Sequence, residues 1–223
     1  MMHASPLAST VVLRLGPVGI TQAVVTTWAV MAVLTLAAWL LTRRRSDPAR
    51  PPGAAELLVT ALLEQIREVV RADPRPLLPL LGTLFLLLLA ANLSGLVPGL
   101  KAPTANLETP AALALIVFCA VHVHGVHTQG LKGYLASFAR PKLIMLPLNV
   151  LSEITRTLSL TVRLFGNIMS GEFLIALVLA LAGLFVPIPL MALELLMGVV
   201  QAYIFTVLAT VFIGAASGEA EQP

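Results

Sequence analysis

The apolar segment Leu143–Phe185 limits, more than any other feature, what this chain can fold into. As one α-helix, its roughly 40 residues would measure about 60 Å, twice the thickness of the hydrocarbon core of a bilayer. Such a helix must tilt strongly, bend or break. The next apolar segment, Pro189–Ala216, would measure roughly 42 Å and also requires tilt. Because only the short turn Phe185–Pro189 separates the two, residues 143–216 are predicted to form a long, strongly tilted membrane hairpin.

The composition extends this interpretation to the whole chain. Of its 223 residues, 58% are hydrophobic and only 11% are charged, whereas soluble domains carry about 25% charged residues. Three earlier apolar segments are candidates to cross a bilayer, the third being short: Ile20–Thr42, Leu77–Leu96 and Pro110–Val126. We therefore expect a single polytopic membrane domain over residues 1–223, all-α in class, with about five transmembrane helices.

The positions of the basic residues predict an orientation. The loop after the first span and the loop after the third carry most of them: Arg43, Arg44, Arg45, Arg50, Arg67, Arg71, Arg75, Lys132, Arg140 and Lys142. The opposite side has only Arg14 and Lys101. The positive-inside rule then places the N-terminus outside and the C-terminus in the cytoplasm. The first segment is expected to be a retained span, because its arginines follow it, unlike those of a signal peptide.

Residues 54–72 are predicted to form an amphipathic helix. Its apolar side chains share one face (Leu58, Leu62, Ile66 and Val69), and its charged ones share the other (Glu56, Glu64, Arg67, Glu68 and Arg71). A helix of this kind lies at the membrane surface or packs on a partner. A charged face that is merely solvated is an open alternative.

Arg163 is the most unusual residue of the predicted hairpin. A cation inside a membrane segment costs about 3 kcal/mol on insertion scales, and arginine does not lose its proton under ordinary conditions. It therefore cannot relay protons, but it can favour ionisation of a carboxylate on a moving partner and repel leaking cations. The alternative is a buried ion pair with Glu172 or Glu153. Glu172 is nine residues away, half a turn out of register on one helix, which disfavours that pair.

Other polar residues of the hairpin suggest an ion path. Glu153 and Arg156 are helical neighbours, either as an interfacial ion pair or as part of an inner access path. Glu194 and Gln201 share a helical face, and Glu172 and Glu194 are predicted to line the outer side of the hairpin, unless each is a separately bonded buried acid. Gly166 and Ser170, like Asn167 and Gly171, are four apart. Small residues at this spacing permit close approach by a partner helix or by this chain itself.

The remaining features exclude several functions. His122, His124 and His127 lack companion ligands at metal spacing, so we expect an interfacial role and no metal site. Cys119 is expected to be a small core residue rather than a reactive thiol. The sequence has no phosphate-binding glycine loop and no nucleophile elbow. We therefore expect no cofactor, no catalytic site on this chain and no nucleic-acid partner.

Four strings together resemble subunit a of the F-type ATP synthases. These are Leu164-Phe-Gly-Asn167 directly after Arg163 with Ser170-Gly-Glu172, Gln201-Ala-Tyr-Ile-Phe205, Asn92-Leu-Ser-Gly-Leu-Val-Pro98, and Pro103-Thr-Ala105. Pro147-Leu-Asn149 is similar to the approach to the hairpin of that family. The resemblance covers at least Leu77–Ala216.

The resemblance implies the stator half of a rotary ion motor in a bacterial inner membrane. The hairpin would clasp a ring of c subunits, with peripheral-stalk b subunits and, indirectly, the catalytic sector as further partners. H⁺ or Na⁺ would reach a ring carboxylate by one half-channel and leave by another, separated by Arg163. Asn167, Glu172, Glu194 and Gln201 match the family's ion-path positions, with Gly166, Ser170 and Gly171 facing the ring.

This chain departs from the family at one pair of positions. Many members carry histidine where this chain has Glu194, so having acids at both Glu172 and Glu194 is distinctive. Two other functions remain open: a stand-alone transporter with an intramembrane Arg–Glu gate, and a non-conducting assembly factor. A stand-alone transporter predicts inverted repeats, and the sequence has none.

Overall fold

The computed structural model describes residues 11–15, 18–43, 53–69, 75–95, 102–138, 143–183 and 185–216. The chain divides into two compact units. The first unit comprises Met1–Pro48, Leu86–Pro110 and Val162–Ala202, and the second comprises Ala49–Phe85, Ala111–Thr161 and Tyr203–Pro223. The long helices α5 and α6 each contribute one half to either unit.

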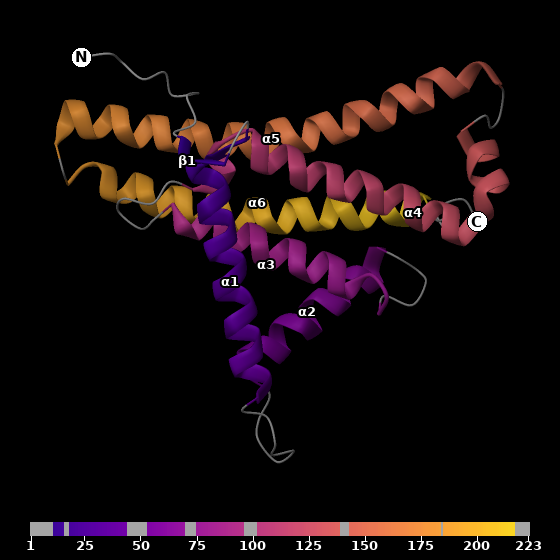
Figure 1. Ribbon diagram of the computed structural model, residues 1–223, viewed down its shortest axis with the longest axis horizontal. Coiled ribbons are helices and arrows are strands. Elements are labelled where there is room, and N and C mark those ends of the chain that lie inside the picture. The colour runs from indigo at the N-terminus through magenta and orange to yellow at the C-terminus, as the bar shows by residue number, and fades with distance from the viewer. Residues whose placement is uncertain are drawn as a thin grey trace. The chain divides into compact units, whose positions relative to one another are not determined.

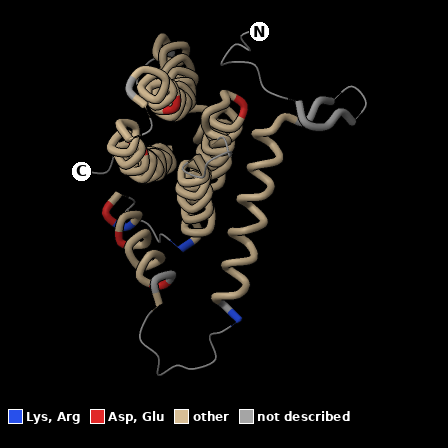
Figure 2. Tube along the Cα trace, turned by 90° about the vertical axis from the view of Figure 1, so that its left-hand side faces the viewer, with Lys and Arg blue, Asp and Glu red and all other residues tan. Residues whose placement is uncertain are grey.

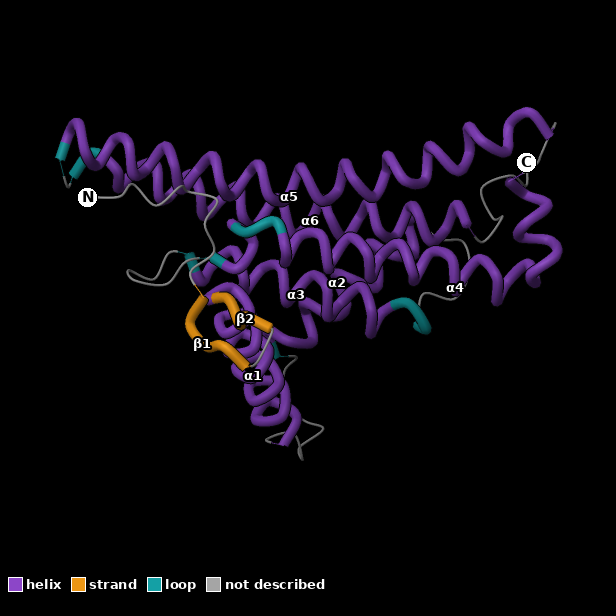
Figure 3. The backbone as a smooth tube through the Cα atoms, turned by 45° about the horizontal axis from the view of Figure 1, so that its top comes forward, coloured by secondary structure: helices purple, strands orange, loops and turns teal. Residues whose placement is uncertain are grey.

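The first unit begins with a hairpin that the sequence analysis did not predict. Strands β1 (Val11–Leu15) and β2 (Val18–Thr21) pair antiparallel, with Leu15 opposite Val18 (Figure 3). Because Ile20 and Thr21 belong to β2, helix α1 begins at Gln22 and ends at Arg43, close to the predicted span. Figure 2 shows α1 as a helix without charge until its end. There the Arg43 guanidinium lies 4.4 Å from the Trp39 ring centre, a cation–π contact.

The paired ends of α5 and α6 complete the first unit. Helix α5 (Leu146–Ala182) ends at Gly183, whose φ of 79° is the left-handed conformation that glycine adopts at helix ends. Helix α6 (Pro187–Ala216) begins with a proline, whose fixed φ suits the first helical position. Figure 1 shows the two helices connected by this short turn. The predicted hairpin is present, and α6 starts two residues before its predicted start at Pro189.

The second unit contains the predicted amphipathic helix. Helix α2 (Ala54–Val69) buries Leu62 and Ile66, while Glu64, Arg67 and Glu68 are exposed. The burial of Leu62 and Ile66 agrees with the predicted apolar face, whereas Glu56 of the charged face is half-buried, like Leu58 and Val69. Residues 70–72 lie outside the described residues. Helix α3 (Leu78–Ser94) follows, with its residues up to Phe85 in this unit and the rest in the first. Its Gly82 faces Leu62 of α2.

Helix α4 is longer than predicted, because it runs from Glu108 to Phe138 instead of from Pro110 to Val126. The prediction followed the apolar run, but the helical backbone continues past it through polar residues such as Thr128 and Gln129. Gly130 interrupts it with φ 73° and ψ 158°, values that only glycine adopts readily. Lys132 therefore lies in a second helical piece, and the three histidines lie within α4 rather than at its end.

The all-α membrane class is confirmed. Four described helices are long and apolar enough to cross a bilayer, namely α1, α4, α5 and α6. Helix α3 is apolar but has 17 residues, or about 25 Å, slightly less than the hydrocarbon core. Helix α5 is continuous over 37 residues, or about 55 Å, so it does not break, as the sequence had left open. Two short 3-10 turns, η1 (Pro103–Ala105) and η2 (Leu143–Met145), precede α4 and α5.

Gly130→Ala is expected to destabilise the fold, because a side chain at this φ and ψ costs on the order of 1–3 kcal/mol. The measurement is the midpoint of thermal unfolding of the purified protein in detergent. Gly133→Ala is the control in the same segment: its φ is not positive, and its added Cβ would be at ordinary van der Waals distance from Gln129. Equal midpoints for the two variants would contradict the strained conformation at Gly130.

Candidate functional site

Arg163 lies on the exposed side of α5. The buried residues of this part of the helix are Leu160, Thr161, Leu164 and Ile168, and Arg163 projects away from that stripe. Among the described residues it makes no ion pair, and Glu153, one of its two candidate partners, binds Arg156 instead. The structure therefore gives no support to the alternative of a buried Arg163 ion pair.

Small polar residues accompany Arg163 along the exposed side of α5. Ser152, Thr155, Ser159, Gly166 and Ser170 follow one another at helical spacing, and all are exposed except the half-buried Gly166. A Cβ atom on Gly166 would have no neighbour within 4 Å. Small side chains let a second helix approach closely in a membrane. This face of α5 therefore offers room for a close partner around a permanent positive charge.

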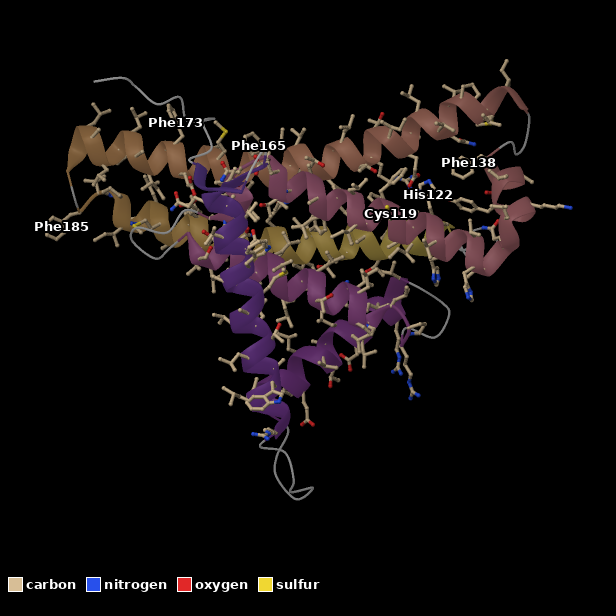
Figure 4. The ribbon with its side chains drawn as sticks, viewed as in Figure 1. Cys119, His122, Phe138, Phe165, Phe173 and Phe185 are labelled. Carbon is tan, nitrogen blue, oxygen red and sulfur yellow. The ribbon has the colours of Figure 1, made fainter. Side chains whose placement is uncertain are left out.

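In the first unit, a cleft of about 380 Å³ separates the second half of α5 from the first half of α6. Most of its lining is apolar, and the polar lining residues are Asn167, Ser170 and Glu194, with Gly171 beside them. The structure thus places four residues that the sequence analysis selected around one cleft. Phe173, which also lines it, is largely exposed on α5 (Figure 4).

The Glu194 side chain packs directly on Gly171. A Cβ atom at Gly171 would lie 2.8 Å from Glu194 Oε1 and 3.0 Å from its Cδ, closer than such atoms approach. Glu172 interacts electrostatically with Glu194, and a shared position of the two acids on the outer side of the hairpin stays a prediction. The sequence left two roles open for Gly171: close contact with a partner helix, or close packing within this chain. In the structure, Gly171 packs within the chain, against Glu194.

Gln201 is buried on α6, unlike the half-buried Glu194. Between them, Gly198 accepts a hydrogen bond of 2.9 Å from Asn92 Nδ2 of α3. The Thr104 hydroxyl of η1 donates to Asn92 Oδ1, also over 2.9 Å. The sequence analysis used Asn92 and Thr104 only as family landmarks and missed this network. A glycine within the apolar stretch of α6 was the available signal for a close contact.

In the second unit, Arg156 is held by neighbours on two helices. It binds Glu153 over 3.3 Å on α5, and its guanidinium lies 4.4 Å from the ring centre of Phe212 on α6. The predicted neighbour pair is therefore present. With Ser152, Thr155 and Ser159, Arg156 also lines a shallow groove on the surface of α5.

The histidines of α4 do not gather around a common point. His122 packs among aromatic rings, 5.8 Å from the Tyr134 ring centre and 6.4 Å from that of Phe138, which follows Gly130 (Figure 4). Its Nδ1 is 2.8 Å from the Phe118 carbonyl oxygen. Among the described residues, no three histidine, cysteine or acidic side chains are arranged to hold a metal ion. Cys119 is a free, exposed thiol, so the expectation that it lies in the core was wrong.

Comparison with known proteins gives one consistent result. The family described as ATP synthase A chain matches residues 24–214. The chain is 66% identical over 220 residues to ATP synthase subunit a 2 of Bradyrhizobium sp., covering 97% of this chain and 98% of that protein. It is also 47% identical over 202 residues to ATP synthase subunit a 1 of Chlorobaculum parvum, covering 89% of each. A subunit a of Albidiferax ferrireducens is 48% identical over 197 residues, covering 87% of this chain and 85% of that protein.

Gly171→Ala is expected to push the Glu194 carboxyl group into the cleft, because the added Cβ needs the space where that group lies. The mobile end of a side chain moves at little cost, so the fold should persist. Carbodiimide labelling of Glu194, quantified by mass spectrometry on the purified chain, should become severalfold faster. Gly166→Ala, whose Cβ meets no neighbour, should leave the labelling rate unchanged. Equal rates in both variants would show that Gly171 does not set the position of Glu194.

Proposed function

The chain belongs to the ATP synthase A chain family, and on this premise we propose that it is subunit a of an F-type ATP synthase. It couples the flow of H⁺ or Na⁺ across the membrane to rotation of a c-subunit ring, and thereby to ATP synthesis or hydrolysis. Its four long apolar helices agree with a multi-pass membrane protein, and the relatives named above are bacterial. The nucleotide chemistry takes place elsewhere in the complex.

The observation that carries the proposal is the exposed position of Arg163 among small residues. A permanent cation in a membrane span is costly unless it has a partner, and Arg163 makes no ion pair with any described residue of this chain. A carboxylate on the neighbouring ring satisfies that need. Arg163 favours the ionised form of this carboxylate as it passes, which makes it release its ion. The fixed charge also repels cations that would cross without turning the ring.

The outer half-channel uses the cleft between α5 and α6. Asn167 and Glu194 line this cleft, and Glu172 interacts electrostatically with Glu194. These polar and acidic groups attract a cation from the outer side. Gln201 continues the path along the Glu194 face of α6. Gly166 and Ser170 leave room for the ring helix.

The inner half-channel follows the shallow groove on α5. Its serine and threonine hydroxyls and Arg156 keep this part of the helix polar, and Glu153 balances the charge of Arg156. This assignment requires the loops after the first and third spans, and the C-terminus, to lie in the cytoplasm, with the N-terminus outside. The charged face of α2 is available to the peripheral-stalk b subunits.

Arg163→Ala is expected to abolish ATP-driven ion pumping into inverted membrane vesicles, because no other group then drives ionisation of the ring carboxylate. Pumping is measured with and without Na⁺, and assembly is verified by co-purification of the ring. Lys132→Ala removes one exposed cation elsewhere and should pump as wild type does. An assembled Arg163→Ala complex that pumps normally would refute the proposal. So would ion transport by the isolated chain in liposomes, which a stand-alone transporter predicts.

Glu172→Gln and Glu194→Gln together are expected to slow coupled turnover more than either change alone. Each remaining acid can still attract cations to the cleft, but the double variant has lost both charges. Turnover is measured as ion-gradient-driven ATP synthesis in vesicles. Undiminished synthesis in the double variant would remove this pair from the ion path.

A further inference from the structure

A buried polar chain joins three separate segments of the first unit. Thr104 of η1 is fully buried, and its hydroxyl donates to Asn92 Oδ1 on α3 over 2.9 Å. The Asn92 amide then donates to the Gly198 carbonyl on α6 over 2.9 Å. Thr104 thereby fixes which way the Asn92 amide faces, since the oxygen is occupied and the NH₂ group must point toward α6.

The Asn92 hydrogen bond meets α6 between two residues of the proposed ion path, Glu194 and Gln201. Gly198 is four residues after Glu194 and three before Gln201, so it lies between them on the same helical face. A helical carbonyl oxygen has a second lone pair beyond the one used within the helix, and Asn92 uses it. Any movement of α6 at this contact moves the carboxyl group of Glu194 and the amide of Gln201.

Helices α3 and α6 approach each other so closely at Gly198 that a side chain there would crowd Asn92. A Cβ atom on Gly198 would lie 3.0 Å from Asn92 Cβ and 3.8 Å from its Nδ2. Gly198 is buried, and the atom facing it is rigidly attached to the α3 backbone. On the other side of Glu194, Gly171 of α5 provides a second close contact. Two close contacts at glycines thus position Glu194: its own contact with Gly171 of α5, and the contact of Gly198, on the same helix as Glu194, with Asn92 of α3.

We propose that Asn92 and Thr104 are positioning residues for the outer ion path: they fix α6 at Gly198 and so set the location of Glu194 and Gln201. This inference rests on the proposed function, since it assigns those two residues to the path. The inference goes beyond the proposed function because it gives a role to Asn92 and Thr104, to which the proposed function assigns no contact with the ion. A hydrogen bond to backbone suits the task, since it fixes the helix while leaving both functional side chains free to interact with the ion.

The experiment uses the complete complex in inverted vesicles and measures ATP-driven pumping, with an acridine dye for protons and radioactive sodium for Na⁺. Thr104→Val keeps the shape of the side chain but removes the hydroxyl, whereas Thr104→Ser keeps the hydroxyl. Asn92→Leu removes both hydrogen bonds at similar volume. Gln129→Leu is the matched control, because the Gln129 amide donates to the Ala216 carbonyl at the other end of α6, over 2.8 Å.

We expect Thr104→Val and Asn92→Leu to lower pumping severalfold in assembled complexes, and Thr104→Ser to restore most of it. Each is then combined with Glu194→Gln. If Asn92 acts through Glu194, the double variant should be little worse than Glu194→Gln alone, because residues acting together are not additive. Gln129→Leu should combine additively with Glu194→Gln.

Two results would overturn the inference: normal pumping by Asn92→Leu, or additive losses in the Asn92→Leu and Glu194→Gln combination. The second would mean that Asn92 supports the fold without setting the ion path. Failure of the proposed function looks different, since Arg163→Ala would then pump normally whatever the Asn92 variants do. A loss in Arg163→Ala with no loss in Glu194→Gln would reject the positioning role along with the outer path to which it refers.

Discussion

Inside a bilayer no water is available to polar groups, so each must find its partner within the protein. The helices meet this constraint with their own backbones, and many hydroxyl groups do the same. Thr26, Thr35, Thr83, Thr155, Thr161 and Thr210 each donate to the carbonyl one turn earlier in their own helix. Other polar groups reach a different helix: the Asn92–Gly198 bond lies beside the candidate ion path, whereas the Gln129–Ala216 bond lies at the other end of α6.

Glycine makes these cross-helix contacts possible. At Gly171 the missing side chain leaves space for the Glu194 carboxyl group, and at Gly198 it lets the α3 backbone carry Asn92 up to α6. Helix association in a membrane relies on such close packing, because lipid provides no hydrophobic drive to bring helices together. The same glycines that hold the hairpin together therefore also place its acidic groups.

Arg163 differs from all of these residues. Asn92 and Thr104 have hydrogen-bond partners in the chain, whereas Arg163 is on the exposed side of α5, beside small residues. The structural contrast with Arg156 is instructive, since that arginine is seven residues earlier and is held by Glu153 and Phe212. Two arginines on one helix thus have different environments.

Much of the fold followed from local sequence properties. Apolar length predicted α1, α5 and α6 to within a few residues, and the alternation of apolar and charged residues predicted α2. The same reasoning placed the end of α4 too early, because apolarity marks the membrane whereas helix formation continues through Thr128 and Gln129. The β1–β2 hairpin was missed because its strands are very short.

The sequence by itself determined that the chain crosses a membrane, which residues are charged inside it, and the family to which it belongs. All three depend on residue type and spacing along a single helix. Only the tertiary structure decided which polar groups meet. Asn92 and Gly198 are 106 residues apart in sequence, and Gly171 and Glu194 come from opposite helices of the hairpin. Helical periodicity tells which face a residue occupies, but not which neighbour covers that face, and the covering neighbour is what positions the acids.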